Sequence, residues 1–252
     1  MFRPRIIPVL LYRNGGLVKS IRFADHRYIG DPINAVRIFN DCFADELIIL
    51  DIEASKKGQP ISTELVREVG EEANMPFAVG GGITTLDQIA ERLRMGAEKV
   101  VLNSVGLNSI PFVRDAVSNF GSSTITACVD VKKNLLGRYQ LYSHSMRKSL
   151  SPNWREHIRM LEDAGVGELI LQSVDMDGTM RGYDANLYKE LASELNMPLV
   201  ALGGVGSYQD IFSLSAQGPV NGFAAGSLFV YYGPMKGVLI NYSKVNCNAF
   251  PN

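Results

Sequence analysis

The sequence has few of the residues that hold small secreted proteins or metal sites together. Its 252 residues include three cysteines, three histidines and one tryptophan. Cys42, Cys128 and Cys247 are odd in number and widely spaced, which is typical of reduced thiols and not of a disulfide frame. The histidines share no ligand spacing. We therefore expect no metal site and no cofactor.

Long apolar runs are also missing. No stretch approaches the roughly 20 residues that a membrane-spanning helix needs, and the N-terminus lacks the apolar core of a signal peptide. The formal net charge of −1 gives no general electrostatic reason to bind nucleic acid or an acidic membrane. We expect a cytoplasmic protein without nucleic-acid or membrane partners, in which local basic pockets for phosphate are still possible.

One pattern occurs twice in the chain. Residues 75–83, Met-Pro-Phe-Ala-Val-Gly-Gly-Gly-Ile, read as a short buried strand that enters a glycine turn, and residues 197–206 repeat it. At the same spacing of 122 residues, 44–51 align with 166–173. A fixed spacing of this kind indicates a repeated architecture. The chain therefore divides into two similar halves, about 1–121 and 122–252.

Eight apolar strands alternate with helices in both halves. Strands are expected at 5–11, 46–50, 77–79, 99–102, 124–129, 168–171, 199–202 and 222–225. Helices are expected at 33–43, 63–74, 85–95, 110–119, 154–164, 185–195 and 208–216, with a last one entered through 226–229, and long polar loops at 12–31 and 132–152. The pattern predicts an α/β fold, a (β/α)8 TIM barrel that forms a single domain over 1–252. A doubly wound open sheet is the alternative, and the half-barrel repeat argues against it.

Glycine and polar residues gather where the strands end, which is the face of such a barrel that carries chemistry. Glycine pairs at these ends let backbone N–H groups close on an anion. We expect one phosphate site at Gly81, Gly82, Asn103 and Ser104, and a second at Asp177, Gly178, Gly204, Gly226 and Ser227. The alternative is that these glycines only form tight turns. Two such sites suit a long ligand with a phosphate at each end.

Several charged residues near the strand ends are further candidates. Asp130 ends the fifth strand and is a candidate general acid or base, although it could instead cap the next turn. Asp51 stands at the end of the second strand. Lys19 in the first loop could neutralise a phosphate, and His144 in the second long loop could reach substrate. For Lys19 and His144, exposure to solvent is the more common outcome.

Five short motifs resemble the cyclase subunit (HisF) of imidazole glycerol phosphate synthase. They are Arg-Ile-Ile-Pro at 5–8, Val-Gly-Gly-Gly-Ile at 79–83, Asn-Ser at 103–104, Asp-Gly-Thr at 177–179 and Gly-Tyr-Asp at 182–184. The resemblance covers essentially the whole chain. It implies a partner glutaminase subunit docked on the N-terminal face of the barrel, and ammonia that crosses the barrel to a bis-phosphorylated substrate. It also implies substrate contacts by Lys19, Asp51 and Thr179.

The resemblance implies two catalytic aspartates, one at the end of strand one and one at the end of strand five. The second is Asp130, whereas Leu11 stands at the first position. Leucine cannot transfer a proton, and loss of one member of an acid–base pair typically removes about 10²- to 10⁴-fold in rate. The histidine-pathway cyclase reaction is therefore in doubt, and whether the chain is itself an enzyme stays open.

The resemblance also implies a charged gate at the opposite end of the barrel, where ammonia enters. Its four members begin strands one, two, four and six and match Arg5, Glu46, Lys99 and Glu168. Charged groups that face an apolar barrel interior are costly unless they are paired. A ring of two cations and two carboxylates meets that requirement. The alternative is a salt-bridge ring with a purely structural role.

We interpret the sequence as a divergent relative of the cyclase subunit that conducts ammonia to another acceptor. By resemblance, such relatives belong to surface-polysaccharide pathways, including lipopolysaccharide and O-antigen biosynthesis. There an ATP-dependent amidotransferase protein converts an acetamido sugar into an acetamidino sugar. A working cyclase of histidine biosynthesis is one alternative. A scaffold that activates the glutaminase without channelling is the other.

Overall fold

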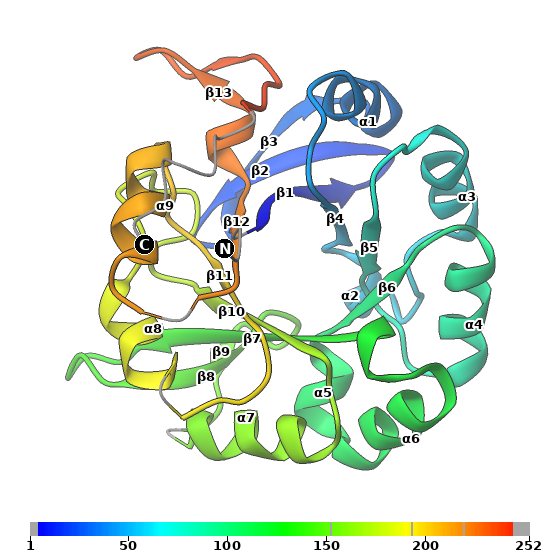
Figure 1. The fold of residues 1–252 in the computed structure, drawn as a ribbon, viewed down its shortest axis with the longest axis vertical. Helices are drawn as coiled ribbons and strands as arrows, with labels where there is room; N and C mark the ends of the chain where they lie inside the picture. Colours follow the sequence, from blue (N-terminus) through cyan, green and yellow to red (C-terminus); the bar gives the residue numbers. More distant parts are fainter. Residues whose placement is uncertain (1–4, 152, 193, 219, 244–252) are drawn as a thin grey trace.

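Eight parallel strands close into a barrel (Figure 1). The computed structural model describes residues 5–151, 153–192, 194–218 and 220–243, so Cys247 lies outside the described residues. The barrel strands in spatial order are β1 (Arg5–Arg13), β4 (Leu47–Asp51), β5 (Phe77–Gly80), β6 (Lys99–Leu102), β7 (Ile125–Lys133), β10 (Glu168–Ser173), β11 (Leu199–Leu202) and β12 (Gly222–Ala225). β12 pairs back with β1, where Arg5 lies opposite Gly222. The prediction of a (β/α)8 barrel is confirmed, and the open sheet is excluded.

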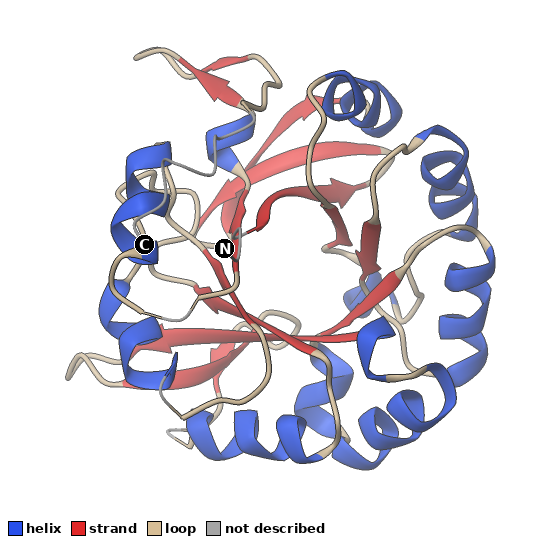
Figure 2. Cartoon of the chain, in the orientation of Figure 1, coloured by secondary structure: helices blue, strands red, loops and turns tan. Residues whose placement is uncertain are grey.

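Helices surround this barrel on the outside (Figure 2). They are α1 (Pro32–Asp41), α2 (Ala54–Lys57), α3 (Thr63–Glu72), α4 (Leu86–Arg94), α5 (Ser104–Asn108), α6 (Ile110–Phe120), α7 (Trp154–Asp163), α8 (Ala185–Ala192) and α9 (Tyr208–Ser215), with the 3₁₀ turn η1 (Ser122–Thr124). Several begin at side chains that accept a backbone N–H. Asp31 accepts from Asn34, and Thr85 and Ser207 form capping boxes. These local signals explain why the helix starts were predictable.

Alternation of side chains along the strands divides the apolar residues into two cores. One lies between the strands and the helices, and the other fills the interior of the barrel, which we call the lumen. The lumen residues are Ile7, Val9, Ile48, Ala78, Val101, Cys128, Ile170, Val200, Leu202 and Ala224, with Leu11 and Leu50 packed against them. The polar residues of the lumen are consequently confined almost entirely to its two ends.

The two long loops expected after strands one and five contain β-hairpins. β2 (Gly16–Ile21) and β3 (Ala24–Gly30) follow β1, and β8 (Tyr139–Ser143) and β9 (Lys148–Ser149) follow β7. β1 continues to Arg13 and turns back through Asn14 and Gly15, whose φ angles are 48° and 88°. Asn-Gly is a strong signal for a tight hairpin turn, so the expectation of a long polar loop over 12–31 was wrong.

The expected last helix is absent from the described residues after β12. The chain instead forms the short 3₁₀ turn η2 (Ser227–Phe229) and a hairpin of β13 (Tyr231–Tyr232) and β14 (Gly237–Val238). Gly233 and Pro234 break the helical pattern, and Gly233 turns with a φ of 70°. Aromatic rings of Phe39, Phe229 and Tyr242 pack together beside this segment. No helix in the described part of the chain has the length and hydropathy to cross a bilayer.

Tyr188 ties α8 to two barrel strands and provides a test of the fold. Its buried hydroxyl lies 2.8 Å from the carbonyl oxygen of Leu202 and 3.1 Å from that of Leu171, and it accepts the Leu202 N–H at 3.2 Å. Tyr188→Phe should lower the free energy of unfolding by about 1–3 kcal/mol because it leaves buried backbone groups unpaired. Thermal denaturation should show a fall of several degrees.

The matched control is Tyr232→Phe, in which the ring is 69% exposed and loss of the hydroxyl should leave the melting temperature unchanged. Equal melting temperatures for Tyr188→Phe and the wild type would contradict the hydrogen bonds described for this residue.

Candidate active site and charged ring

A cavity opens at the carboxyl ends of the barrel strands, and Asp130 lies in its floor. We call it the central cavity, and Leu11, Leu50, Val101, Asn103 and Cys128 also line it. Asp130 is 3% exposed and accepts a hydrogen bond from Asn103 Nδ2 at 3.1 Å. Burial raises the pKa of Asp130 to about 7, against the lowering effect of the Asn103 hydrogen bond. A carboxyl group with this pKa can donate or accept a proton near neutral pH.

Leu11 occupies the wall of the central cavity on the opposite side of the barrel from Asp130. β1 and β7 are four strands apart in either direction around the closed sheet. Leu11 pairs in register with Leu50 of β4 and Val18 of β2. Apolar side chains therefore flank the position at which the resemblance implies a second aspartate, and Asp130 faces them without a matching carboxylate from β1.

Asp51 and Thr179 contribute to turns next to the site. Asp51 Oδ1 accepts the backbone N–H groups of Glu53 and Ala54 at 2.9 and 3.1 Å, so it caps α2 while it lines the central cavity. Burial raises the pKa of Asp51. The Thr179 hydroxyl donates to the carbonyl oxygen of Met176 at 2.8 Å. Of the two residues, Asp51 is the one that the structure places at the cavity.

The first expected phosphate site is brought together beside the central cavity. Gly81, Gly82, Asn103 and Ser104 line one common depression there. Gly82 has a φ of +66°, and a Cβ at this position would approach the carbonyl oxygen of Gln59 to 2.0 Å. The turn therefore requires glycine.

The second expected phosphate site is also brought together, and Lys19 is buried in it. Asp177, Gly178, Gly204, Gly226 and Ser227 line one cavity with Lys19. Lys19 is 4% exposed, because β2 folds back along β1, and its Nζ donates to the carbonyl oxygen of Val9 at 2.6 Å. Burial lowers the pKa of Lys19 to about 8, opposed by the charge of Asp177. The expectation that Lys19 is solvated was wrong.

The Asp177 carboxylate fastens the tip of the β2–β3 hairpin over the site. It accepts from Ser20 Oγ at 3.2 Å, from the Phe23 backbone N–H at 3.3 Å and from Gln172 Nε2 at 3.4 Å. Burial raises the pKa of Asp177. These donors engage both oxygens of Asp177. The residue therefore holds the second site together, and its contacts give no evidence that it binds phosphate directly.

Aromatic residues cover the central cavity, and sequence reasoning missed most of them. The ring of Phe23 meets His144 edge to face at 5.1 Å and lies 6.0 Å from Tyr142. His144 lines the cavity, is partly buried and has its pKa lowered by that burial, so the expectation of a solvated histidine was wrong. No sequence signal reports this contact, because it forms between two separate hairpins.

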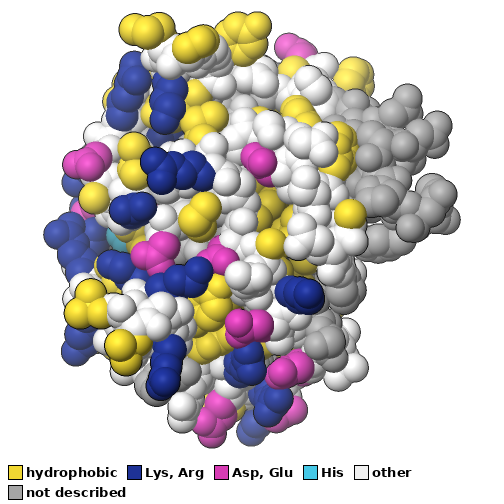
Figure 3. All heavy atoms as spheres, turned by 90° about the vertical axis from the view of Figure 1, so that its left-hand side faces the viewer, with side chains coloured by type: hydrophobic (Ala, Val, Ile, Leu, Met, Phe, Trp, Pro, Cys, Tyr) yellow, Lys and Arg dark blue, Asp and Glu magenta, His cyan; other side chains and the backbone are white. Residues whose placement is uncertain are grey.

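The segment that contains the second of these hairpins is rich in cations. Residues 131–153 contain five cations and no carboxylate, namely Lys132, Lys133, Arg138, Arg147 and Lys148. Lys and Arg side chains gather on the left of Figure 3. A local excess of positive charge attracts anionic ligands even when the net charge of the chain is near zero.

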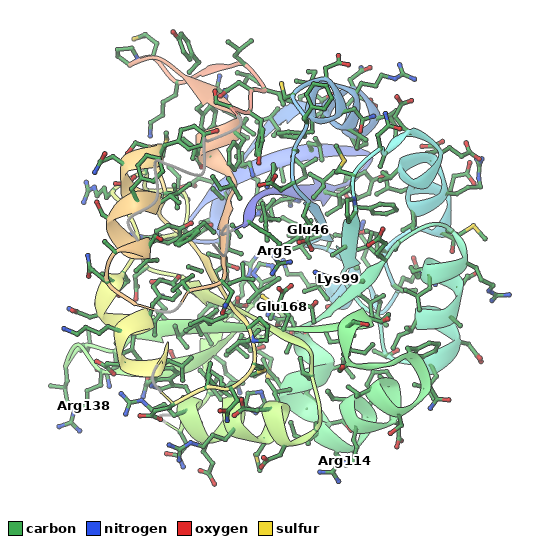
Figure 4. The ribbon with its side chains drawn as sticks, viewed as in Figure 1. Arg5, Glu46, Lys99, Arg114, Arg138 and Glu168 are labelled. Carbon is green, nitrogen blue, oxygen red and sulfur yellow. The ribbon has the colours of Figure 1, made fainter. Side chains whose placement is uncertain are left out.

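At the opposite end of the lumen, four charged side chains form a closed ring. They are Arg5, Glu46, Lys99 and Glu168, which point toward one another in Figure 4. Arg5 Nη1 lies 2.5 Å from Glu46, and its Nη2 also pairs with Glu168. Lys99 Nζ lies 2.8 Å from Glu46 and 3.3 Å from Glu168. Each buried carboxylate therefore contacts both cations, as the ring predicted from the sequence requires.

Comparison with known proteins decides the family. The model of a family described as histidine biosynthesis protein matches residues 5–236. The chain belongs to this histidine biosynthesis protein family.

Members of the family from three bacteria resemble the chain over nearly its full length. A Leptospira borgpetersenii protein, provisionally named imidazole glycerol phosphate synthase subunit HisF, is 44% identical and the match covers 96% of each chain. A Pseudomonas aeruginosa protein provisionally named subunit hisF2 is 41% identical over 98% of each chain. The imidazole glycerol phosphate synthase subunit HisF of Alkaliphilus metalliredigens is 36% identical over 92% of each chain. The chain is thus a HisF-like synthase subunit.

The raised pKa of Asp130 in this HisF-like barrel gives a testable pH dependence. The folded state binds the proton up to about pH 7, whereas the unfolded state releases it near 3.8. The contribution of Asp130 to stability is therefore fully present below about pH 4 and is lost as pH rises through about 7. The free energy of unfolding of the wild type minus that of Asp130→Asn should fall over this window and then level off.

Urea denaturation of both proteins from pH 4 to pH 8 measures this difference. Subtraction of the Asp130→Asn value removes the contribution of the other titrating groups, which both proteins share. A difference that does not change between pH 4 and pH 8 would mean that Asp130 ionises near its ordinary pKa.

Proposed function

We propose that the chain is the barrel subunit of a glutamine amidotransferase complex and conducts ammonia to an acceptor other than the cyclase substrate. A separate glutaminase subunit docks on the N-terminal face of the barrel and releases ammonia at the ring of Arg5, Glu46, Lys99 and Glu168. The acceptor is a sugar precursor in lipopolysaccharide or O-antigen biosynthesis, amidinated by an ATP-dependent protein at the other face. The observation that carries this proposal is a complete ring at one end of the lumen and Leu11 at the other.

The ring supports passage of a small neutral molecule better than it supports stability. A buried ion pair is seldom worth more than well-packed apolar residues of the same volume. Glu46 and Glu168 are 4% and 7% exposed, so both carboxylates bear the cost of desolvation. Paired charges at the entrance of an apolar lumen offer hydrogen-bonding groups to a small polar molecule such as ammonia before it enters.

Leu11 argues against the cyclase chemistry. Of the two positions where the resemblance implies an aspartate, Asp130 alone has a carboxyl group. Asp51, the other carboxyl group that lines the central cavity, uses one oxygen to cap α2. A general acid and a general base on opposite faces of a substrate need two proton-transfer groups.

The names of the relatives support the interpretation that this chain is a second, divergent form of the cyclase subunit. The Pseudomonas aeruginosa relative bears the suffix of a second gene and is 41% identical, while the Alkaliphilus metalliredigens HisF is 36% identical.

The first alternative function is a working cyclase of histidine biosynthesis. The second is a scaffold that activates the glutaminase without conducting ammonia.

The first test asks whether the barrel has cyclase activity of its own. Purified protein is given the bis-phosphorylated ribulosyl substrate of the cyclase and a high ammonium concentration at alkaline pH, so that no glutaminase is needed. We expect no detectable turnover by the wild type and turnover by Leu11→Asp, because the substitution restores a proton-transfer group worth about 10²- to 10⁴-fold in rate.

Leu11→Asn is the matched control, because it is polar and of similar size but cannot exchange a proton at neutral pH. Turnover by the wild type within about tenfold of Leu11→Asp would overturn the proposal and favour the histidine-pathway alternative.

The second test blocks the ring. In the complete complex, Lys99→Trp should leave glutamine hydrolysis intact and reduce glutamine-dependent amidination of the acceptor by at least about tenfold, because the bulky ring fills the entrance. Amidination driven by added ammonium should not change. Arg114→Trp introduces the same side chain at an exposed position of α6, far from the ring (Figure 4). This variant should behave as the wild type. Unchanged coupling in Lys99→Trp would favour the scaffold alternative.

A further inference from the structure

One strand of the barrel carries polar groups through the whole length of the lumen. Side chains at alternate positions of β7 face the same side. Cys128 belongs to the lumen core and Asp130 lines the central cavity, whereas Ile125, Ala127, Val129 and Val131 belong to the outer core. Thr126 therefore faces the lumen below Cys128. The order from the ring to the mouth is Thr126, Cys128, Asp130.

Thr126 lies immediately above the charged ring. Its register partners are Glu168 of β10 on one side and Val101 of β6 on the other. Glu168 is a ring member, and Lys99, also of the ring, lies two residues before Val101 on β6. A molecule that leaves the ring toward the mouth therefore meets Thr126 at the first level of the lumen.

The Thr126 hydroxyl has no hydrogen-bond partner among the described residues. The residue is 1% exposed and its Oγ1 is buried. A buried hydroxyl left unpaired destabilises the folded state, so native proteins rarely keep one without a bound water or ligand. Glu168 lies next to it in register but uses both carboxylate oxygens on Arg5 and Lys99. Within the described structure, the hydroxyl is free to bind a molecule in the lumen.

The other walls at this height offer no competing polar side chain. Between the ring and the level of Asp130 and Gln172, the described lumen side chains are aliphatic except for Thr126 and Cys128. A molecule that crosses the lumen therefore has hydrogen-bonding groups on the β7 side alone. An ion would lose its hydration there without compensation, so the chemistry selects a small neutral molecule.

We infer that ammonia crosses the lumen along β7 and that the Thr126 hydroxyl is its first binding point beyond the ring. The inference rests on the proposed function, since it assigns a route to the channel. A hydroxyl can accept an N–H of ammonia or donate to its lone pair. Thr126 is a positioning residue: it holds ammonia on the lumen side of the ring, and the thiol of Cys128 offers a weaker partner before Asp130.

The test removes the hydroxyl without changing the shape of the side chain. The complete complex of this chain, the glutaminase and the acceptor enzyme is supplied with glutamine, and the product formed per glutamine hydrolysed is measured. Thr126→Val should lower this ratio about two- to tenfold, the range expected for the loss of one hydrogen bond worth 0.5–1.5 kcal/mol. Thr126→Ser retains the hydroxyl and should restore the ratio. Glutamine hydrolysis and the product formed with added ammonium should be unchanged in both variants.

Two outcomes separate this inference from the proposed function. If Lys99→Trp uncouples the complex and Thr126→Val does not, the channel stands and the inference is wrong. If neither variant changes the ratio, the channel itself fails.

A crystal structure of the complex at high resolution gives an independent readout. It should show a single solvent-sized molecule within hydrogen-bonding distance of Thr126 Oγ1 in the wild type and none in Thr126→Val. An empty position in the wild type would overturn the inference. If the molecule is present and Thr126→Val couples as well as the wild type, the molecule is a trapped structural water. This result also rejects the inference.

Discussion

The alternation of side chains along the strands of a closed parallel sheet is the constraint on which the rest of this molecule depends. Closure removes every sheet edge, so each strand must supply one apolar set to the helices and another to the lumen. Apart from Thr126, the polar side chains of the described lumen lie where they are paired or reach solvent. The ring at one end and the cavity at the other are the two places that meet this condition.

Two hairpins interrupt the alternation of strand and helix. They supply side chains to the candidate site that the short barrel strands cannot supply. Lys19 enters the second expected phosphate site because β2 pairs with β1 and carries it back over the mouth. Phe23 and His144 meet above Asp130 because hairpins from opposite halves of the chain converge there. Asp130, whose pKa is raised by burial, thus lies in a cavity that residues of both hairpins help to line.

Structural features that depend on neighbouring residues were predictable from the sequence. Features that depend on contacts between distant segments were not. Strand positions and helix starts such as Asp31-Pro32 were predictable, since apolar runs and caps act within a few residues. The four ring residues were expected from the resemblance to the cyclase subunit, and the structure brings them together. The Asn14-Gly15 turn had a local signal that was overlooked. The burial of Lys19, the contact of Phe23 with His144 and the hairpin in place of a last helix depend on packing between segments far apart in the chain.

The ring and the mouth differ in how they respond to the loss of one member. Removal of one cation from the ring would leave two buried carboxylates with a single cationic partner, which costs stability. A leucine at position 11 leaves nothing unpaired, because Asp130 keeps its hydrogen bond from Asn103 and can hold a proton near neutral pH. Mutual dependence among the four charges therefore accounts for part of the ring without any reference to ammonia. Thr126 has no such dependence, since valine would fit its place and would remove an unpaired hydroxyl. A buried polar group that stability does not require therefore supports the proposed route through the lumen more directly than the ring does.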